Sequence, residues 1–86
     1  MGELSKLPNI GPAVEKQLEL VGITTFEELK NVGSKDGWLR IKEIDSSACI
    51  HRLYALEGAI KGIKKNELSK EMKEELKKFY NENKSI

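Results

Sequence analysis

The sequence holds few of the residues and patterns that mark several common classes of protein. It has one cysteine, Cys49, so no disulfide can form within the chain. No apolar run approaches the roughly 20 residues that a membrane-spanning helix needs. The first residues also lack the charged and then apolar pattern of a secretory signal. We therefore expect a cytoplasmic protein without a membrane partner.

The residue sets of catalytic and metal sites are missing as well. His51 is the single histidine, and it lies two residues after Cys49 on an expected helix, where the two side chains point to different faces. Neither a Ser-His-Asp triad nor a zinc site can be assembled from them, and no glycine-rich phosphate loop is present. We expect no enzymatic activity, metal, cofactor or small-molecule substrate. Cys49 is interpreted as a small buried side chain and His51 as a surface residue.

Strong positive charge is absent too. Lys and Arg number 15 against 14 Asp and Glu, which gives a net charge of +1, whereas nucleic-acid-binding domains are typically strongly basic. The charge is uneven, because residues 1–60 carry seven basic and nine acidic side chains and residues 61–86 carry eight and five. Any binding of phosphate must therefore be local.

Apolar residues recur at helical spacing through nearly the whole chain, and no alternating strand pattern of useful length occurs. A length of 86 residues suffices for one domain. The sequence predicts a single all-α domain over residues 1–86, ordered over about 3–80, with a frayed tail from Asn81. Five or six short helices are expected, over residues 2–6, 12–21, 25–31, 34–44, 47–62 and 69–82.

Three helix starts carry capping residues. Thr25 with Glu28 forms a capping box, and Ser34 and Ser69 precede other helices. Trp38 begins the repeat Trp38, Ile41, Ile44 and is expected in the core.

The helix expected over 47–62 is predicted to be central. Arg52 and Glu57 lie among its apolar residues and are interpreted as partly buried charges that pair for structural reasons. Its small residues would allow another helix to approach closely; they are Ala55, Gly58, Ala59 and Gly62.

The tight turn between the first two expected helices has the features of an anion-binding site. Gly11 lets the backbone turn, Ile10 is expected to plug the gap between the helices, and Pro12 suits a first helical position. The N–H groups from Gly11 to Val14 have no partner within a helix, which makes this helix start a ready anion site. The segment reads Leu7-Pro8-Asn9-Ile10-Gly11-Pro12-Ala13.

This segment resembles the helix-hairpin-helix motif, in which the backbone of the hairpin binds a DNA phosphate without reading sequence. Pro8, Ile10, Gly11 and Pro12 match the motif. Asn9 stands where many members have glycine. Asparagine tolerates positive φ, so we expect the turn to survive, with a side chain that would crowd a phosphate.

A second stretch resembles the signature of the TfoX (Sxy) C-terminal domain family, named after a bacterial regulator of competence. The resemblance spans about residues 3–77 and includes the hairpin with its asparagine. It implies a regulatory protein linked to transcription or DNA, and this chain looks like a short, stand-alone member. The stretch reads Cys49-Ile50-His51-Arg52-Leu53-Tyr54-Ala55-Leu56-Glu57-Gly58-Ala59.

Two functional hypotheses follow. The first is a regulatory module that contacts the DNA backbone and so recognises little sequence. The second is a protein-interaction or weakly homodimerising module that uses the hairpin and the small-residue helix. The contact residues of the first hypothesis are Asn9, Ile10, Gly11, Ala13 and Val14, with Lys6, Lys16 and Lys61 as charge support.

The lysines of the C-terminal third allow two interpretations. They would form either a face toward DNA or an ordinary solvated surface mixed with glutamates, and the second is favoured. These lysines are Lys61, Lys64, Lys65, Lys70, Lys73, Lys77 and Lys78; the glutamates are Glu67, Glu71, Glu74 and Glu75.

Overall fold

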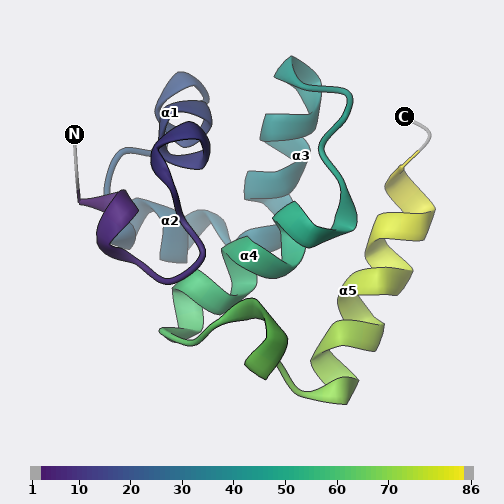
Figure 1. Ribbon diagram of the computed structural model, residues 1–86. Helices are drawn as coiled ribbons and strands as arrows, with labels where there is room; N and C mark the ends of the chain where they lie inside the picture. Colours follow the sequence, from purple (N-terminus) through teal and green to yellow (C-terminus); the bar gives the residue numbers. More distant parts are fainter. Residues whose placement is uncertain (1–2, 85–86) are drawn as a thin grey trace.

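The computed structural model describes residues 3–84, and all of its regular elements are helical. Helix α4 lies in the middle and packs against α2, α3 and α5 (Figure 1). The predicted all-α fold and the central place of this helix are confirmed. No helix among residues 3–84 is long and apolar enough to cross a membrane. The elements are η1 (Leu4–Lys6), α1 (Pro12–Leu20), α2 (Phe26–Val32), α3 (Ser34–Ile44), α4 (Ile50–Lys61), η2 (Lys65–Glu67) and α5 (Lys70–Asn83).

Several boundaries differ from the prediction. The first element is a single 3-10 turn, and η2 was not foreseen because it has no apolar repeat. Helix α4 begins at Ile50 instead of residue 47, because the carboxylate of Asp45 accepts hydrogen bonds from the N–H and hydroxyl of Ser47 and holds a turn there. Helix α5 continues to Asn83, one residue beyond its predicted end, and the last two residues of the tail that was expected to fray lie outside the described residues.

The caps are partly as predicted. The hydroxyls of Thr25 and Ser69 accept hydrogen bonds from the N–H groups of Glu28 and Met72, which confirms both as N-caps. Ser34 is not a cap. Gly33, with a φ of 88°, both ends α2 and precedes α3, so Ser34 is already helical and its hydroxyl is turned toward α4.

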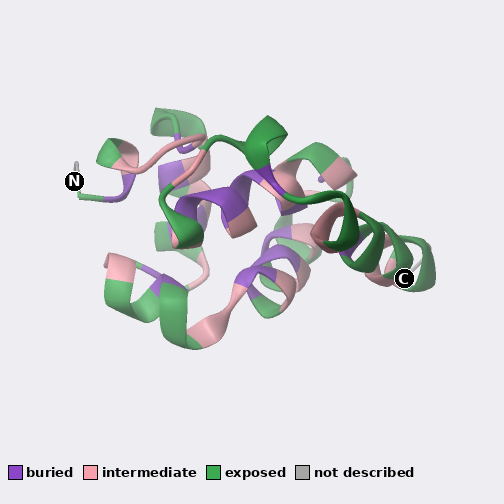
Figure 2. Ribbon diagram, turned by 90° about the horizontal axis from the view of Figure 1, so that it is seen from below, coloured by how far each residue is buried: buried purple, intermediate pink, exposed green. Residues whose placement is uncertain are grey.

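The core forms around Trp38, which is fully buried as predicted. Its ring meets Phe79 and Tyr80 of α5 edge to face, and its Nε1 donates to the carbonyl of Cys49 at 3.1 Å. Buried residues gather on the faces that the helices turn toward one another (Figure 2). The core includes Leu4, Ile10, Leu18, Ile23, Leu29, Trp38, Ile41, Leu53, Leu56 and Leu76.

Three apolar or small side chains, those of Leu20, Ile44 and Cys49, are exposed to solvent. Ile44 ends the predicted apolar repeat but is 50% exposed, and Leu20 is 67% exposed. Cys49 is exposed, contrary to the prediction, because it lies in the extended N-cap position of α4 and only its carbonyl is turned toward Trp38. His51 is on the surface as predicted and contacts the ring of Tyr54 edge to face.

Candidate phosphate-binding hairpin

The hairpin joins η1 to α1 through a turn at Asn9 and Ile10. Asn9 has a φ of 70°, a conformation that asparagine adopts more readily than most residues. Ile10 is 4% exposed and belongs to the hydrophobic core, which agrees with its predicted inward position. Gly11 is extended and serves as the N-cap of α1, and Pro12 occupies the first helical position.

The buried carboxylate of Glu15 links the two helical elements of the hairpin. Glu15 is only 9% exposed, and its Oε2 accepts hydrogen bonds from the N–H groups of Leu4 at 3.1 Å and Ser5 at 3.2 Å. It therefore ties α1 to the start of η1. Sequence reasoning missed this role, although the three-residue spacing to the buried Leu18 placed Glu15 on the inner face.

The outer side of the hairpin presents backbone donors. Among residues 3–84, the N–H groups of Gly11, Ala13 and Val14 have no hydrogen-bond acceptor. Gly11 and Ala13 are exposed, and so are the side chains of Lys6 and Lys16. The N–H of Ile10 differs, because it donates to the carbonyl of Leu7 at 3.3 Å. Three backbone donors and two lysines are thus available to an anion.

The side chain of Asn9 is turned inward, away from this donor set. Its Nδ2 donates to the carbonyls of Ile63 at 3.0 Å and Ala55 at 3.4 Å, and its Oδ1 accepts from the N–H of Lys65 at 3.0 Å. The expectation that Asn9 would crowd a phosphate is therefore corrected. Gly58 makes room for this contact, since a Cβ there would lie 2.6 Å from Nδ2 of Asn9.

Lys61 does not join the other two predicted lysines. Its Nζ lies 3.5 Å from the carboxylate of Glu57, one turn earlier on α4. Glu57 also accepts a hydrogen bond of 2.6 Å from the hydroxyl of Ser34 at the start of α3. Lys61 therefore pairs with a carboxylate that is also bonded to α3. The lysine that contacts the hairpin is Lys65, through its backbone N–H.

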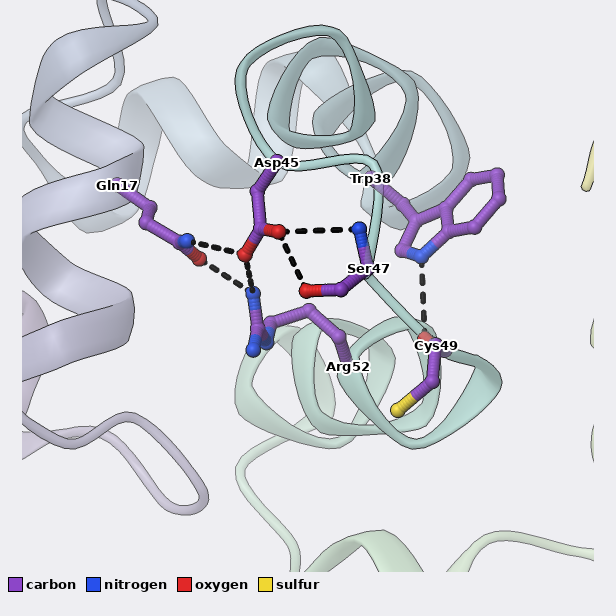
Figure 3. Close-up of polar contacts among 6 residues, drawn as sticks. All are labelled: Gln17, Trp38, Asp45, Ser47, Cys49 and Arg52. Carbon is purple, nitrogen blue, oxygen red and sulfur yellow. Dashed lines mark hydrogen bonds and ion pairs between the residues drawn. The ribbon is translucent and has the colours of Figure 1, made fainter. Parts of the chain in front are cut away.

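A polar cluster joins α1 to α4 through the turn at Asp45 (Figure 3). Oδ2 of Asp45 accepts from Nε2 of Gln17 at 2.9 Å and lies 3.6 Å from Nη1 of Arg52, which also donates to Gln17. The hydrogen bond from the Ser47 hydroxyl, and then that from Gln17, lower the pKa of Asp45 to about 2. The interpretation of Arg52 as a structurally paired charge is confirmed.

The small residues of α4 contribute to packing inside the domain. Ala55, Gly58 and Ala59 are buried, and Gly58 faces the Asn9 side chain and the chain after α4 instead of another helix. At Gly58 the close neighbour is therefore the hairpin and the chain after α4, where the sequence predicted a helix. The described residues also contain no group of three His, Cys, Asp or Glu side chains placed to hold a metal ion.

Comparison with known proteins places the chain in a family. The family described as the TfoX C-terminal domain matches residues 1–80. Protein Sxy of Escherichia coli (strain K12) is 37% identical over 73 residues, which are 85% of this chain and 35% of Sxy, so the chain spans about a third of that relative's length.

Two crystal structures of a protein of unknown function from Listeria monocytogenes are also similar to this chain, each at 54% sequence identity. The triclinic form has a TM-score of 0.91, with 92% of this chain and 90% of that chain covered. The tetragonal form has a TM-score of 0.88, with 91% and 96% covered. The hairpin with its inward asparagine and the α4 segment that receives it both lie within the matched family region, and the chain belongs to the TfoX C-terminal domain family.

Proposed function

We propose that this domain is a non-enzymatic, cytoplasmic regulatory module that associates with DNA through contacts between the hairpin backbone and a phosphate. The observation that carries the proposal is the set of three backbone donors that have no acceptor among the described residues, the N–H groups of Gly11, Ala13 and Val14. They stand at the positive end of the nine-residue helix α1, where an anion is favoured. The TfoX C-terminal domain family, whose resemblance implies a link to transcription or DNA, supports a regulatory role.

The charge around the hairpin suits a weak, sequence-independent contact. Lys6 and Lys16, which precede and follow the donors in the sequence, are exposed, and the carboxylate of Glu15 is turned inward onto the N–H groups of η1. A net charge of +1 gives little long-range attraction. Binding therefore depends on the local geometry of the hairpin and carries little sequence information.

The test is fluorescence anisotropy of a labelled random-sequence duplex, titrated with the protein at a low and a higher salt concentration. We expect binding at low salt that weakens steeply as salt rises, because each neutralised phosphate releases counterions. Lys16→Glu should reduce the affinity about tenfold. Lys30→Glu is the matched control, because Lys30 is an exposed helical lysine on α2 and carries the same change of charge.

Two results would count against the hairpin. Absence of binding at high protein concentration would remove DNA as a partner of this domain. Equal losses in Lys16→Glu and Lys30→Glu would mean that the attraction is general and does not come from the hairpin.

The exposed side chains of Leu20 and Ile44 favour a second candidate, a protein-contact or homodimerising module. Large apolar side chains exposed to this extent gain free energy when a partner covers them. Sedimentation of the protein over a range of concentrations tests this. A concentration-dependent dimer that Leu20→Gln abolishes would support an apolar interface, which high salt should leave intact.

A further inference from the structure

The charges of α5 are separated onto two edges of the helix. At 3.6 residues per turn, Lys70, Lys73 and Lys77 fall on one edge, and Glu71 and Glu75 fall on the other. The basic edge faces α4, because the hydroxyl of Tyr54 donates to the carbonyl of Lys73 at 3.4 Å. The acidic edge faces α3, where Lys35 Nζ lies 2.8 Å from the carboxylate of Glu75. Three lysines that are interspersed with glutamates in the sequence therefore gather along one edge in space, with Glu74 at its border.

A small pocket opens beside the basic edge, between α4, η2 and α5. It has a volume of about 190 Å³ and is lined by His51, Tyr54, Lys65, Asn66 and Lys73. The exposed imidazole of His51 meets the Tyr54 ring at 6.2 Å between ring centroids and an angle of 80°. Two aromatic residues and two lysines thus border one small hollow.

Hydrogen bonds hold the backbones of the two lysines that line this pocket, while their ammonium groups keep donors that can bind an anion. The N–H of Lys65 is fixed by Asn9 of the hairpin. Nζ of Lys73 donates to the carbonyl of Asn66 at 3.4 Å, which uses one of its three protons. The nearest acidic side chains along the chain are Glu67, which accepts from the N–H of Lys64, and Glu74, which borders the edge.

We propose that this surface binds single-stranded nucleic acid, with phosphates on Lys65, Lys73 and Lys77 and an unpaired base against His51 and Tyr54. Proteins that hold single strands combine a basic track with aromatic side chains on which bases stack. A duplex keeps its bases paired and stacked, so it would leave the pocket empty. An acidic polypeptide would be held by the lysines alone and would make no use of the aromatic rings. The surface lies outside the donor set of the hairpin and goes beyond the duplex contact proposed for it.

The test is fluorescence anisotropy of a labelled oligo-dT at low salt, with neighbouring residues of α5 as variant and control. Lys77→Glu changes the basic edge, and Lys78→Glu makes the same change of charge one residue further on, beyond that edge. Both lysines are exposed, so neither variant should disturb the fold. We expect Lys77→Glu to weaken oligo-dT binding about tenfold and Lys78→Glu to leave it within about twofold. His51→Ala should weaken it at least about fivefold through loss of stacking.

Three results would overturn the proposal. The first is no binding of oligo-dT at low salt, and the second is an equal loss in Lys77→Glu and Lys78→Glu. The third is binding of poly-glutamate with the same dependence on Lys77 and none on His51, which would assign the surface to an acidic protein partner. Lys16→Glu separates this surface from the hairpin, because it should weaken binding of duplex and spare that of oligo-dT.

Discussion

Asn9 lies at the tip of the hairpin with a φ of 70°, and its side chain forms hydrogen bonds with Ala55 in the middle of α4 and with the chain beyond the helix. The amide fits this place because it supplies donors for two carbonyls and an acceptor for one N–H. The backbone of the turn is thereby left for solvent or a ligand, while the side chain sets where the hairpin sits on the domain.

Replacing Asn9 with glycine isolates the side chain, because glycine adopts the same positive φ without strain. We expect Asn9→Gly to lower the free energy of unfolding by about 1–3 kcal/mol, since three polar groups lose a partner. Urea denaturation followed by circular dichroism measures this. A value within about 0.5 kcal/mol of the original protein, as for an ordinary surface change, would mean that these hydrogen bonds contribute nothing.

Asp45 makes a prediction about pH. Its pKa in the folded protein is about 2, below the ordinary value of 3.8, so folding favours the ionised carboxylate. The stability that this gives is present above pH 3.8 and is lost as the pH falls from 3.8 through 2. In Asp45→Asn this contribution is absent at every pH.

The measurement is the urea midpoint of both proteins at intervals from pH 5 to pH 2. The original protein should lose stability more steeply than Asp45→Asn over this range, so that the two curves converge at low pH. Other carboxyls, including Glu28 and Glu75, titrate in both proteins and cancel in the comparison. Parallel curves would show that the cluster around Asp45 does not stabilise the fold.

At the scale of elements, two helical glycines differ in how much space a Cβ atom would have. A Cβ on Gly58 of α4 would lie 2.6 Å from Nδ2 of Asn9 and 2.8 Å from the carbonyl oxygen of Ile63, a backbone atom. A Cβ on Gly37 of α3 would meet Leu56 at 3.6 Å, with Ile23 and Leu29 at 3.8 Å, which is ordinary contact.

The two alanine variants should therefore differ in sign. Gly37→Ala is expected to stabilise the protein by about 0.5–1 kcal/mol through helix propensity. Gly58→Ala is expected to destabilise it by about 1–3 kcal/mol, because the hairpin and the end of α4 must move apart. Thermal unfolding of both proteins under one set of conditions gives the comparison. Stabilisation by both changes would show that α4 and the hairpin are not in close contact.

Much of this arrangement could be predicted from local sequence. Helical spacing and the caps at Thr25 and Ser69 depend on neighbouring residues, so the helices were predicted to within a few residues. The turn at Asn9, Ile10 and Gly11 was likewise predictable, because its conformation depends on the residues in it.

Contacts between distant parts of the chain could not be predicted in this way. Asn9 pairs with groups 46 to 56 residues away, and no local pattern shows which polar side chain will meet them. The inward Glu15 and the engagement of Lys61 with Glu57 depend on tertiary packing for the same reason. Cys49 was misplaced because its burial followed from assuming a helix that begins earlier than α4 does.

At the scale of the whole molecule, a net charge of +1 conceals an uneven surface. Backbone donors with Lys6 and Lys16 lie at the hairpin, and Lys65, Lys73 and Lys77 lie along α5 and its pocket. Asn9 links the two regions through Lys65. The two proposed contacts are thus separate in chemistry, one through backbone N–H groups and one through ammonium groups and aromatic rings, and are joined by one side chain.

The most direct test of the hairpin is an NMR titration of the ¹⁵N-labelled protein with a short random-sequence duplex at low salt. A phosphate bound by the backbone should shift the amide signals of Gly11, Ala13 and Val14 first and most, while the amide of Ile10, already bonded to Leu7, moves less. The shifts should reverse as salt is added. Unchanged signals at Gly11, Ala13 and Val14, with shifts confined to other helices or absent altogether, would contradict the account.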